Sequence, residues 1–272
     1  MKIKYYGVRG SIPVPGPDTV RYGGNTPCVA VWNGNDLLIL DGGTGLRVLG
    51  DDLMSTAFGR GKGQGTFLFS HLHWDHIQGF PFFKPAYIAG NSFKLYGPSH
   101  IDVTLEDAMR QQQQYQNFPF LIEDMPADIT FTEFTEGQML ELNGMAITNH
   151  RLNHPGGVFA YRICSQGKSV VYATDTEHYA ALDPRLLELA DHADVLIYDA
   201  TYTSEEYRDH VSWGHSTWEE GVRIAKAAGV KALHLFHHDP SHTDKIIDAI
   251  VKEARGQFRN TFAAREGWEI NI

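Results

Sequence analysis

The stretch FLFSHLHWDHIQGF, residues 67–80, places three histidines and an aspartate within six positions, directly after an apolar segment. His71 and His73 alternate along an extended chain, so both can face one metal ion. Asp75 and His76 follow a turn and can face a second ion. Neutral imidazoles and carboxylates suit Zn²⁺, Mn²⁺ or Fe²⁺, and a motif without cysteine disfavours a structural zinc finger. The motif therefore predicts half of a two-metal site at a strand end.

Composition limits the function classes that this site can serve. The chain has 272 residues, 42% hydrophobic and 21% charged, which is typical of a globular protein with a substantial core. We see no linker, so we expect one domain over residues 1–272. A net charge of −10 argues against binding a long nucleic acid, because phosphate contacts need clustered Lys and Arg. Two cysteines, no signal-like N-terminus and no membrane-spanning stretch predict a cytoplasmic protein without a membrane partner.

The hydrophobic pattern indicates strands followed by helices, twice over. A hairpin over residues 28–41 precedes the strand 66–70 and a helix over 101–116. The second half has strands over 144–154, 158–164, 169–175, 195–200 and 230–236, with helices over 183–193, 216–229 and 241–254. Asp183 is the expected N-cap of its helix, with Pro184 at the first helical position. This order predicts an α/β protein, a four-layer αββα sandwich with two sheets inside and helices on both outer faces.

Polar residues end several of these strands. Strand-end positions are occupied by Asp41, His71, Asp175, Asp199 and His237. Strands that each end in a residue able to bind metal imply one common edge where they converge. The sequence therefore predicts the site at one edge of the two sheets.

The order of these motifs resembles the metallo-β-lactamase superfamily of binuclear metallohydrolases. The resemblance covers nearly the whole chain and rests on Asp41, the cluster 71–76, His154 in NHPGG, Asp175 in ATDTE and His237 in LFHHDP. Within the superfamily the chain looks most like the ribonuclease Z and cyclic-phosphodiesterase branch. Three segments carry that likeness: GVRGSIPVPGPDTVRYGGNTPC (7–28), YDATY (198–202) and GHST (214–217).

The resemblance implies a ligand set for two divalent metal ions. One ion would be held by His71, His73 and His154. The second would be held by Asp75, His76 and His237, with Asp175 bridging both. We expect zinc, with manganese or iron as alternatives, and hydrolysis by a metal-bridging hydroxide. Asp41 is expected to be a buried acceptor that organises the metal loop rather than a ligand.

The segment WGHSTWEEG, residues 213–221, predicts a helix start beside the metals. Ser216 and Glu219 have capping-box spacing, which makes Ser216 the expected N-cap. His215 then precedes a helix N-terminus that attracts anions but disfavours imidazolium, so its charge needs a partner. Asp199 is the natural one, and the ribonuclease Z likeness implies such a pair. His215 would protonate the oxygen that leaves a phosphodiester; the alternative is a histidine that only begins the helix.

The tRNA-processing enzymes of this branch carry a long basic arm, and residues 77–153 contain no such insertion. Together with the acidic charge, this favours a small phosphodiester, such as a cyclic nucleotide, as substrate. The aromatic segment 80–87 and the residues Tyr115, Phe118 and Phe120 either pack in the core or stack on a base. Asn25 either donates to a phosphate or belongs to a turn, and His238 either enters the pocket or lies on the surface.

Four other functions remain open at this level. They are hydrolysis of a lactone, thioester or β-lactam, tRNA 3′-end processing, a diiron oxygen or redox sensor, and a metal-binding regulator without turnover. The fold alone does not choose among them. A homodimer is common in the branch, but no residue pattern here specifies an interface.

Overall fold

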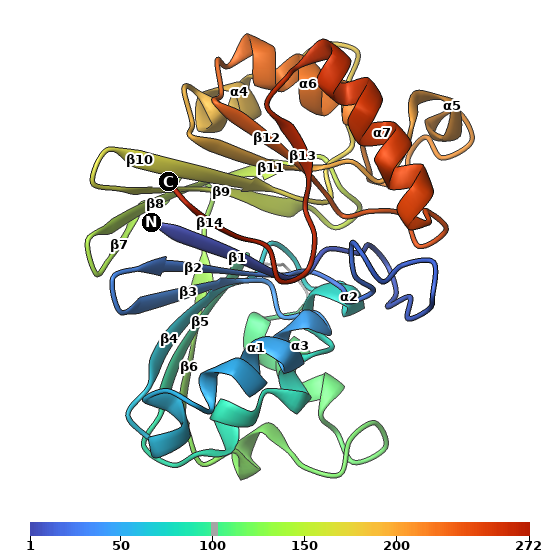
Figure 1. Ribbon diagram of the computed structural model, residues 1–272. Helices are drawn as coiled ribbons and strands as arrows, with labels where there is room; N and C mark the ends of the chain where they lie inside the picture. The colour runs from blue at the N-terminus through green and yellow to red at the C-terminus, as the bar shows by residue number, and fades with distance from the viewer. Residues whose placement is uncertain (99–102) are drawn as a thin grey trace.

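The computed structural model describes residues 1–98 and 103–272 and contains two seven-stranded sheets (Figure 1). The first sheet has the order β14 (Glu269–Asn271), β1 (Lys2–Gly7), β2 (Cys28–Asn33), β3 (Asp36–Leu40), β4 (Gln64–Leu68), β5 (Ser92–Pro98), β6 (Asp128–Phe134). The second has the order β13 (Thr261–Ala263), β12 (Ala232–Phe236), β11 (Val195–Asp199), β10 (Lys168–Ala173), β9 (Val158–Ser165), β8 (Met145–Leu152), β7 (Leu140–Leu142). Strands β3–β6 are parallel in the first sheet, as are β10–β13 in the second.

Helices cover the outer face of each sheet, as Figure 1 shows. The first sheet is covered by α1 (Gly45–Leu53), α3 (Leu105–Gln112) and the short helices η1 (Phe58–Arg60), η2 (Phe80–Phe82), η3 (Lys84–Tyr87) and η4 (Ile122–Asp124). The second is covered by α4 (Pro184–Ala190), α6 (Trp218–Ala227) and α7 (Asp244–Gln257). The short helices α2 (Trp74–Ile77) and α5 (Ser204–Tyr207) lie in loops. The predicted four-layer αββα sandwich is confirmed.

Side-chain alternation along the inner strands produces three apolar layers. On β2, Val29 and Val31 pack between the two sheets, whereas Cys28 and Ala30 pack under the outer helices. Because both faces of such a strand are buried, its sequence is almost continuously apolar. None of the helices in the described ranges is long and apolar enough to cross a bilayer.

Most of the predicted elements are confirmed, but some differ in extent and others were not predicted. The hairpin is the antiparallel pair β2–β3, and Asp183 caps α4 by accepting from the Arg185 amide. The helix predicted over 101–116 is shorter, running from Leu105 to Gln112 with Thr104 as its N-cap; residues 101 and 102 lie outside the described ranges. The helix α1 and the strands β1, β5 and β6 were not predicted from the sequence.

The expected N-cap of α6 is wrong by one residue. Thr217 is the N-cap, and its side chain accepts from the Glu220 amide. The Ser216 hydroxyl instead contacts His178 Nδ1 at 3.0 Å and the Tyr198 hydroxyl at 2.9 Å. Two adjacent hydroxyl residues can both cap a helix, and here the buried contacts of Ser216 leave that role to Thr217.

The carboxyl ends of the parallel strands meet at one edge of the sandwich. Asp41 follows β3, His71 follows β4, Asp175 follows β10, and His237 follows β12. Three of them, Asp41, Asp175 and His237, have positive φ values of 58°, 51° and 58°. Non-glycine residues in this region of backbone space cost energy and cluster at functional sites. Here the sharp turn directs each side chain into the space between the strand ends.

Candidate metal and catalytic centre

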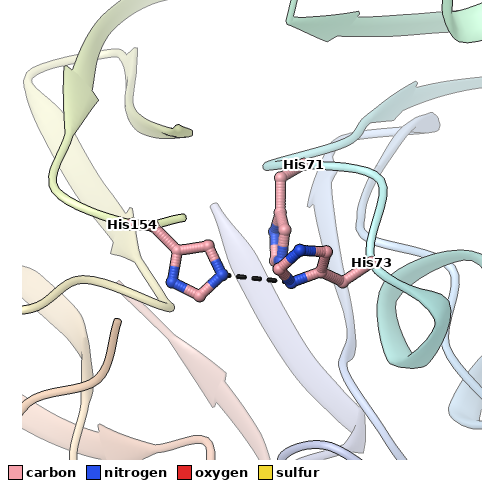
Figure 2. A group of neighbouring side chains, drawn as sticks. All are labelled: His71, His73 and His154. Atoms are coloured by element: carbon pink, nitrogen blue, oxygen red, sulfur yellow. Dashed lines mark hydrogen bonds between the residues drawn. The ribbon is translucent and has the colours of Figure 1, made fainter. Parts of the chain in front are cut away.

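The structure brings all seven predicted ligand positions together in two neighbouring groups. We call the first the three-histidine group; it consists of His71, His73 and His154 (Figure 2). We call the second the carboxylate group; it consists of Asp75, His76, Asp175 and His237. Within each group, one nitrogen or oxygen per residue lies within 4.8 Å of all the others.

The three-histidine group joins the two halves of the chain. His71 and His73 come from the segment after β4, and His154 follows β8 in the second sheet. Figure 2 shows the three rings converging, with His154 Nε2 3.1 Å from His73 Nδ1. His71 and His154 are buried and His73 is exposed. This group therefore lies at the solvent side of the centre.

The carboxylate group is buried throughout. Asp75 Oδ2 lies 3.3 Å from both His76 Nε2 and His237 Nε2. Asp175 reaches His76 Nε2 at 3.3 Å with one oxygen and His237 Nε2 at 3.2 Å with the other. The latter oxygen is also 3.8 Å from His71 Nε2, so Asp175 lies between the two groups.

Asp41 is a buried acceptor that holds the segment of Ser70 and His76 in place, as the sequence predicted. Its completely buried carboxylate accepts from the Ser70 amide at 2.7 Å, the Ser70 hydroxyl at 2.8 Å and the Tyr172 hydroxyl at 2.7 Å. The same carboxylate is 2.8 Å from His76 Nδ1. A carboxylate on Nδ1 fixes the ring so that Nε2 points into the centre.

The other buried rings of the two groups are also held through Nδ1. His154 Nδ1 donates to the Gly214 carbonyl at 2.8 Å, and Thr201 Oγ1 lies 3.0 Å from His237 Nδ1. For His71 the Nδ1 partner is Ser70 Oγ at 3.1 Å. The orientation of each ring is therefore set before any ligand arrives.

His215 and Asp199 form the predicted pair beside both groups. His215 Nδ1 is 3.0 Å from Asp199 Oδ2, and its ring lies 5.4 Å from that of His154 and 4.9 Å from that of His237. Asp199 is fully buried, whereas the His215 side chain remains 12% exposed. Because Nδ1 faces the carboxylate, Nε2 of His215 is available to a bound molecule.

The charge environment differs between these rings. Burial lowers the pKa of His71, His73 and His154. Burial also acts against the charged form of His76, but the nearby carboxylates, Asp175 first, outweigh it and raise its pKa. For His215 the charge of Asp199 likewise outweighs burial and raises the pKa to about 9. In the metal-free protein the carboxylates therefore favour the charged forms of His76 and His215, whereas the three-histidine group favours the neutral form.

The donor set fits divalent metal ions. His71 Nε2 is buried without a hydrogen-bond partner among the described residues, and His76 Nε2 faces carboxylate oxygens of Asp75 and Asp175 at 3.3 Å. Buried polar atoms normally have hydrogen-bond partners, so the orphaned nitrogen of His71 calls for a ligand that accepts its lone pair. Imidazole nitrogens together with carboxylate oxygens are ligands of Zn²⁺, Mn²⁺ and Fe²⁺.

Glu177 is a residue of the site that sequence reasoning missed. Its buried carboxylate accepts from the Tyr207 hydroxyl at 2.7 Å and from the amides of Ser212 at 2.6 Å and Gly214 at 3.0 Å. It thereby fixes the loop whose Gly214 carbonyl holds His154. Gly214 has φ +87°, and a Cβ there would lie 2.3 Å from His154 Nδ1. Only the position of Glu177 two residues after Asp175 signalled this role in the sequence.

Two residues left open by the sequence lie outside the centre. The side chain of Asn25 donates to Glu266 at 2.9 Å, and its backbone carbonyl accepts from Val8 and Arg9, which favours the turn role. His238 is buried and 3.0 Å from the Ala264 carbonyl, so it is neither a surface residue nor a group that faces the centre.

Known proteins resemble this chain over most of its length. A family model described as the beta-lactamase superfamily domain matches residues 62–238, more than half of the chain. Ribonuclease Z from Picrophilus torridus is 24% identical, in an alignment that covers 100% of this chain and 96% of the relative.

Solved structures share the fold. The metallo-β-lactamase fold protein YhfI from Bacillus subtilis has a TM-score of 0.73 at 22% identity, covering 99% of both chains. Unliganded yeast PDE1 has a TM-score of 0.71 at 12% identity, covering 100% of this chain and 99% of that one. The chain therefore belongs to the β-lactamase superfamily, adopts the metallo-β-lactamase fold, and has hydrolases such as ribonuclease Z among its relatives.

Proposed function

We propose that this protein is a metal-dependent phosphodiesterase that hydrolyses a small phosphodiester such as a cyclic nucleotide. The observation that carries the proposal is the His215–Asp199 pair, held at 3.0 Å beside both groups of the centre. Cleavage of an alkyl phosphodiester releases an alkoxide, which needs a proton. His215 Nδ1 faces Asp199, and its Nε2 has no hydrogen-bond partner among the described residues, so the ring is placed to supply that proton.

Two divalent ions, zinc in our proposal with manganese or iron as alternatives, would be held by the two groups. The three-histidine group would bind one ion and Asp75, His76 and His237 the other, with Asp175 shared. Such ions supply Lewis acidity and lower the pKa of bound water towards neutrality. The anchors on Nδ1, including Asp41 and the Gly214 carbonyl, would keep the ligand nitrogens directed at the ions.

His215 and Asp199 would act together on the substrate. Asp199 accepts at the other oxygen from the Thr201 amide at 3.0 Å and hydroxyl at 2.7 Å, which fixes the carboxylate. The fixed carboxylate then orients the His215 ring and stabilises its charged form. A cationic donor near a dianionic transition state both neutralises charge and protonates the leaving oxygen.

The proposed substrate is small for two reasons. The net charge of −10 leaves little basic surface for a long polyanion. The alignment with ribonuclease Z from Picrophilus torridus spans 312 positions, more than the 272 residues of this chain, so the relative has residues without a counterpart here. RNA cleavage is the second candidate, since the curated relatives include proteins named ribonuclease Z.

A substrate panel tests this proposal. Protein loaded with zinc, manganese or iron would be assayed on cyclic nucleotides, bis(p-nitrophenyl) phosphate, a structured RNA, a lactone, a thioester and a β-lactam. We expect metal-dependent turnover of the small diesters and little of the carbonyl compounds. Faster cleavage of RNA than of any small diester would favour the second candidate, and turnover of carbonyl substrates alone would overturn the phosphodiesterase.

A further inference from the structure

A surface pocket opens beside the metal motif, on the exposed side of α2. It encloses about 300 Å³, at the lower end of the range for small-molecule sites. Its walls include three aromatic residues, Trp74, Phe82 and Phe118, and three amide residues, Gln78, Gln112 and Asn117. Neither the proposed metal ligands nor the His215–Asp199 pair lines it.

One helical turn carries both the pocket and the metal motif. Trp74 lies between His73 and Asp75 in the chain, and Gln78 is four residues further, so Trp74 and Gln78 share one face of α2. Asp75 is buried in the centre, whereas Trp74 is 75% exposed. The pocket therefore adjoins the proposed ligands along the chain.

The pocket offers flat aromatic surface. Phe82 is 55% exposed, and its ring meets that of Phe118 edge to face at 5.3 Å. Covering such exposed aromatic side chains with a ligand is favourable, because it removes apolar surface from water. Planar aromatic ligands stack on surfaces of this kind.

The amide groups add directional acceptors. Each NH₂ group already donates within the protein: Gln78 to Thr26 Oγ1 at 3.2 Å, Gln112 to Met109 Sδ at 3.5 Å and Asn117 to the Gln111 carbonyl at 3.1 Å. Across residues 1–98 and 103–272, the three amide oxygens accept no hydrogen bond. The side chains that line the pocket in these ranges also carry no charge. Each NH₂ group keeps a second N–H, so the matching ligand is a neutral, planar ring that donates N–H groups and also accepts hydrogen bonds.

We propose that this pocket binds the nucleobase of the substrate, a purine with an exocyclic amino group such as adenine. The proposal rests on the phosphodiesterase function proposed above and specifies its substrate class as nucleoside phosphodiesters. An apolar loop of a partner, or a second copy of this chain, fits less well because it would leave the amide oxygens unpaired.

The test compares a diester that has a base with one that lacks it. The measured quantity is the ratio of kcat/KM for 3′,5′-cyclic AMP to that for methyl p-nitrophenyl phosphate. Loss of a base-stacking ring lowers binding by about 5- to 150-fold, so F118A should reduce this ratio by that factor. W74A should do the same, while W74F, which keeps a ring, should retain most of it.

Two controls keep the result interpretable. Y115A removes an aromatic residue that is 70% exposed on the same loop but does not line the pocket, and it should leave the ratio as in the wild type. Metal content is measured for both Trp74 variants, because their residue lies between two proposed ligands. A ratio that stays constant in F118A and W74A would overturn the proposal.

A binding measurement separates this proposal from the proposed function. Adenosine should quench the fluorescence of Trp74 in the metal-free protein, and W74F should lose that quenching. If the wild type hydrolyses no diester yet binds adenosine in this way, the proposed phosphodiesterase function is wrong and the proposed base-binding pocket is supported. If diesters are hydrolysed but adenosine does not bind, the base site fails. A dimer that dissociates in F118A would identify the pocket as an interface and also overturn the proposal.

Discussion

The three-histidine group and the carboxylate group lie side by side but have different electrostatic environments. The first consists of three rings whose pKa values lie below the usual value, and its member His73 is exposed to solvent. The second has two carboxylates facing two imidazoles and is buried throughout. Without metal, the two carboxylates favour the charged form of His76, whereas the three-histidine group contains no carboxylate of its own. We therefore expect a divalent cation to bind the carboxylate group more tightly and to exchange more readily at the three-histidine group.

Asp175 faces both groups, so changing it should have the largest effect on metal affinity. D175N keeps the shape and tolerates the positive φ of 51°, since Asn adopts this conformation readily. It removes the charge shared by both groups, so we expect a loss of metal affinity above the roughly 10–100-fold caused by changing an outer partner. Metal content after dialysis and diester turnover check this. Two ions retained at wild-type affinity would contradict the shared role.

Graded chelation should separate the two groups. We expect metal to leave in two steps, first from the three-histidine group and then from the buried carboxylate group. H73Q should abolish the first step and leave the second, while D75N should weaken the second. Metal content and the thermal unfolding midpoint, followed against chelator concentration, report both steps. A single step in the wild type, or loss of the tighter ion in H73Q, would reverse the proposed order.

Glu177 offers a more selective perturbation. In E177Q an NH₂ group replaces one of the two carboxylate oxygens and loses an accepted hydrogen bond from the loop at 207–214. The Gly214 carbonyl then holds His154 less firmly, so affinity at the three-histidine group should fall by about 10–100-fold while the carboxylate group keeps its ion. Titration with zinc measures both sites. As a matched control, E188Q changes an exposed glutamate on α4 and should alter neither.

The smallest effect is a pH dependence of opposite sign in the two groups of the metal-free protein. The folded pKa of His76 is above its usual 6.5, so its contribution to stability is present below pH 6.5 and is lost as pH rises through the folded value. The folded pKa of His71 is below 6.5, so the unfolded chain takes up a proton that the folded chain does not, and stability falls as pH falls below 6.5.

Urea unfolding over a pH series measures this difference. Removing either titration changes the slope of the unfolding free energy by up to about 1.4 kcal/mol per pH unit. H76Q should therefore lose most stability relative to the wild type on the acid side. H71Q should lose least there. Equal pH profiles for the two variants would mean that the groups do not differ in charge.

The strand-end pattern made much of this centre predictable from the sequence. Asp41, His71, Asp175 and His237 each follow a strand, and parallel strands end at the same edge, so their convergence follows from the fold class. The sequence also indicated the pairing of His215 with Asp199, because a histidine before a helix N-terminus needs a compensating charge.

The remaining features depend on contacts that local sequence does not encode. The Gly214 carbonyl is a backbone group, and only the tertiary path of its loop brings it to His154. Glu177 acts through amides more than 30 residues away. Ser216 and Thr217 have equally good capping chemistry, and buried contacts to Tyr198 decided between them. The helix α1 follows a glycine-rich turn that masked its start.

The most direct test of the central claim is the dependence of the H215A effect on the leaving group. Metal-loaded wild type and H215A would be compared on 3′,5′-cyclic AMP, which releases an alkoxide, and on bis(p-nitrophenyl) phosphate, whose leaving group needs little protonation. A proton donor predicts a loss of about 10²–10⁴-fold on the cyclic nucleotide and a much smaller loss on the activated diester, with metal content unchanged. Equal losses on both substrates, or no loss on the cyclic nucleotide, would contradict the account.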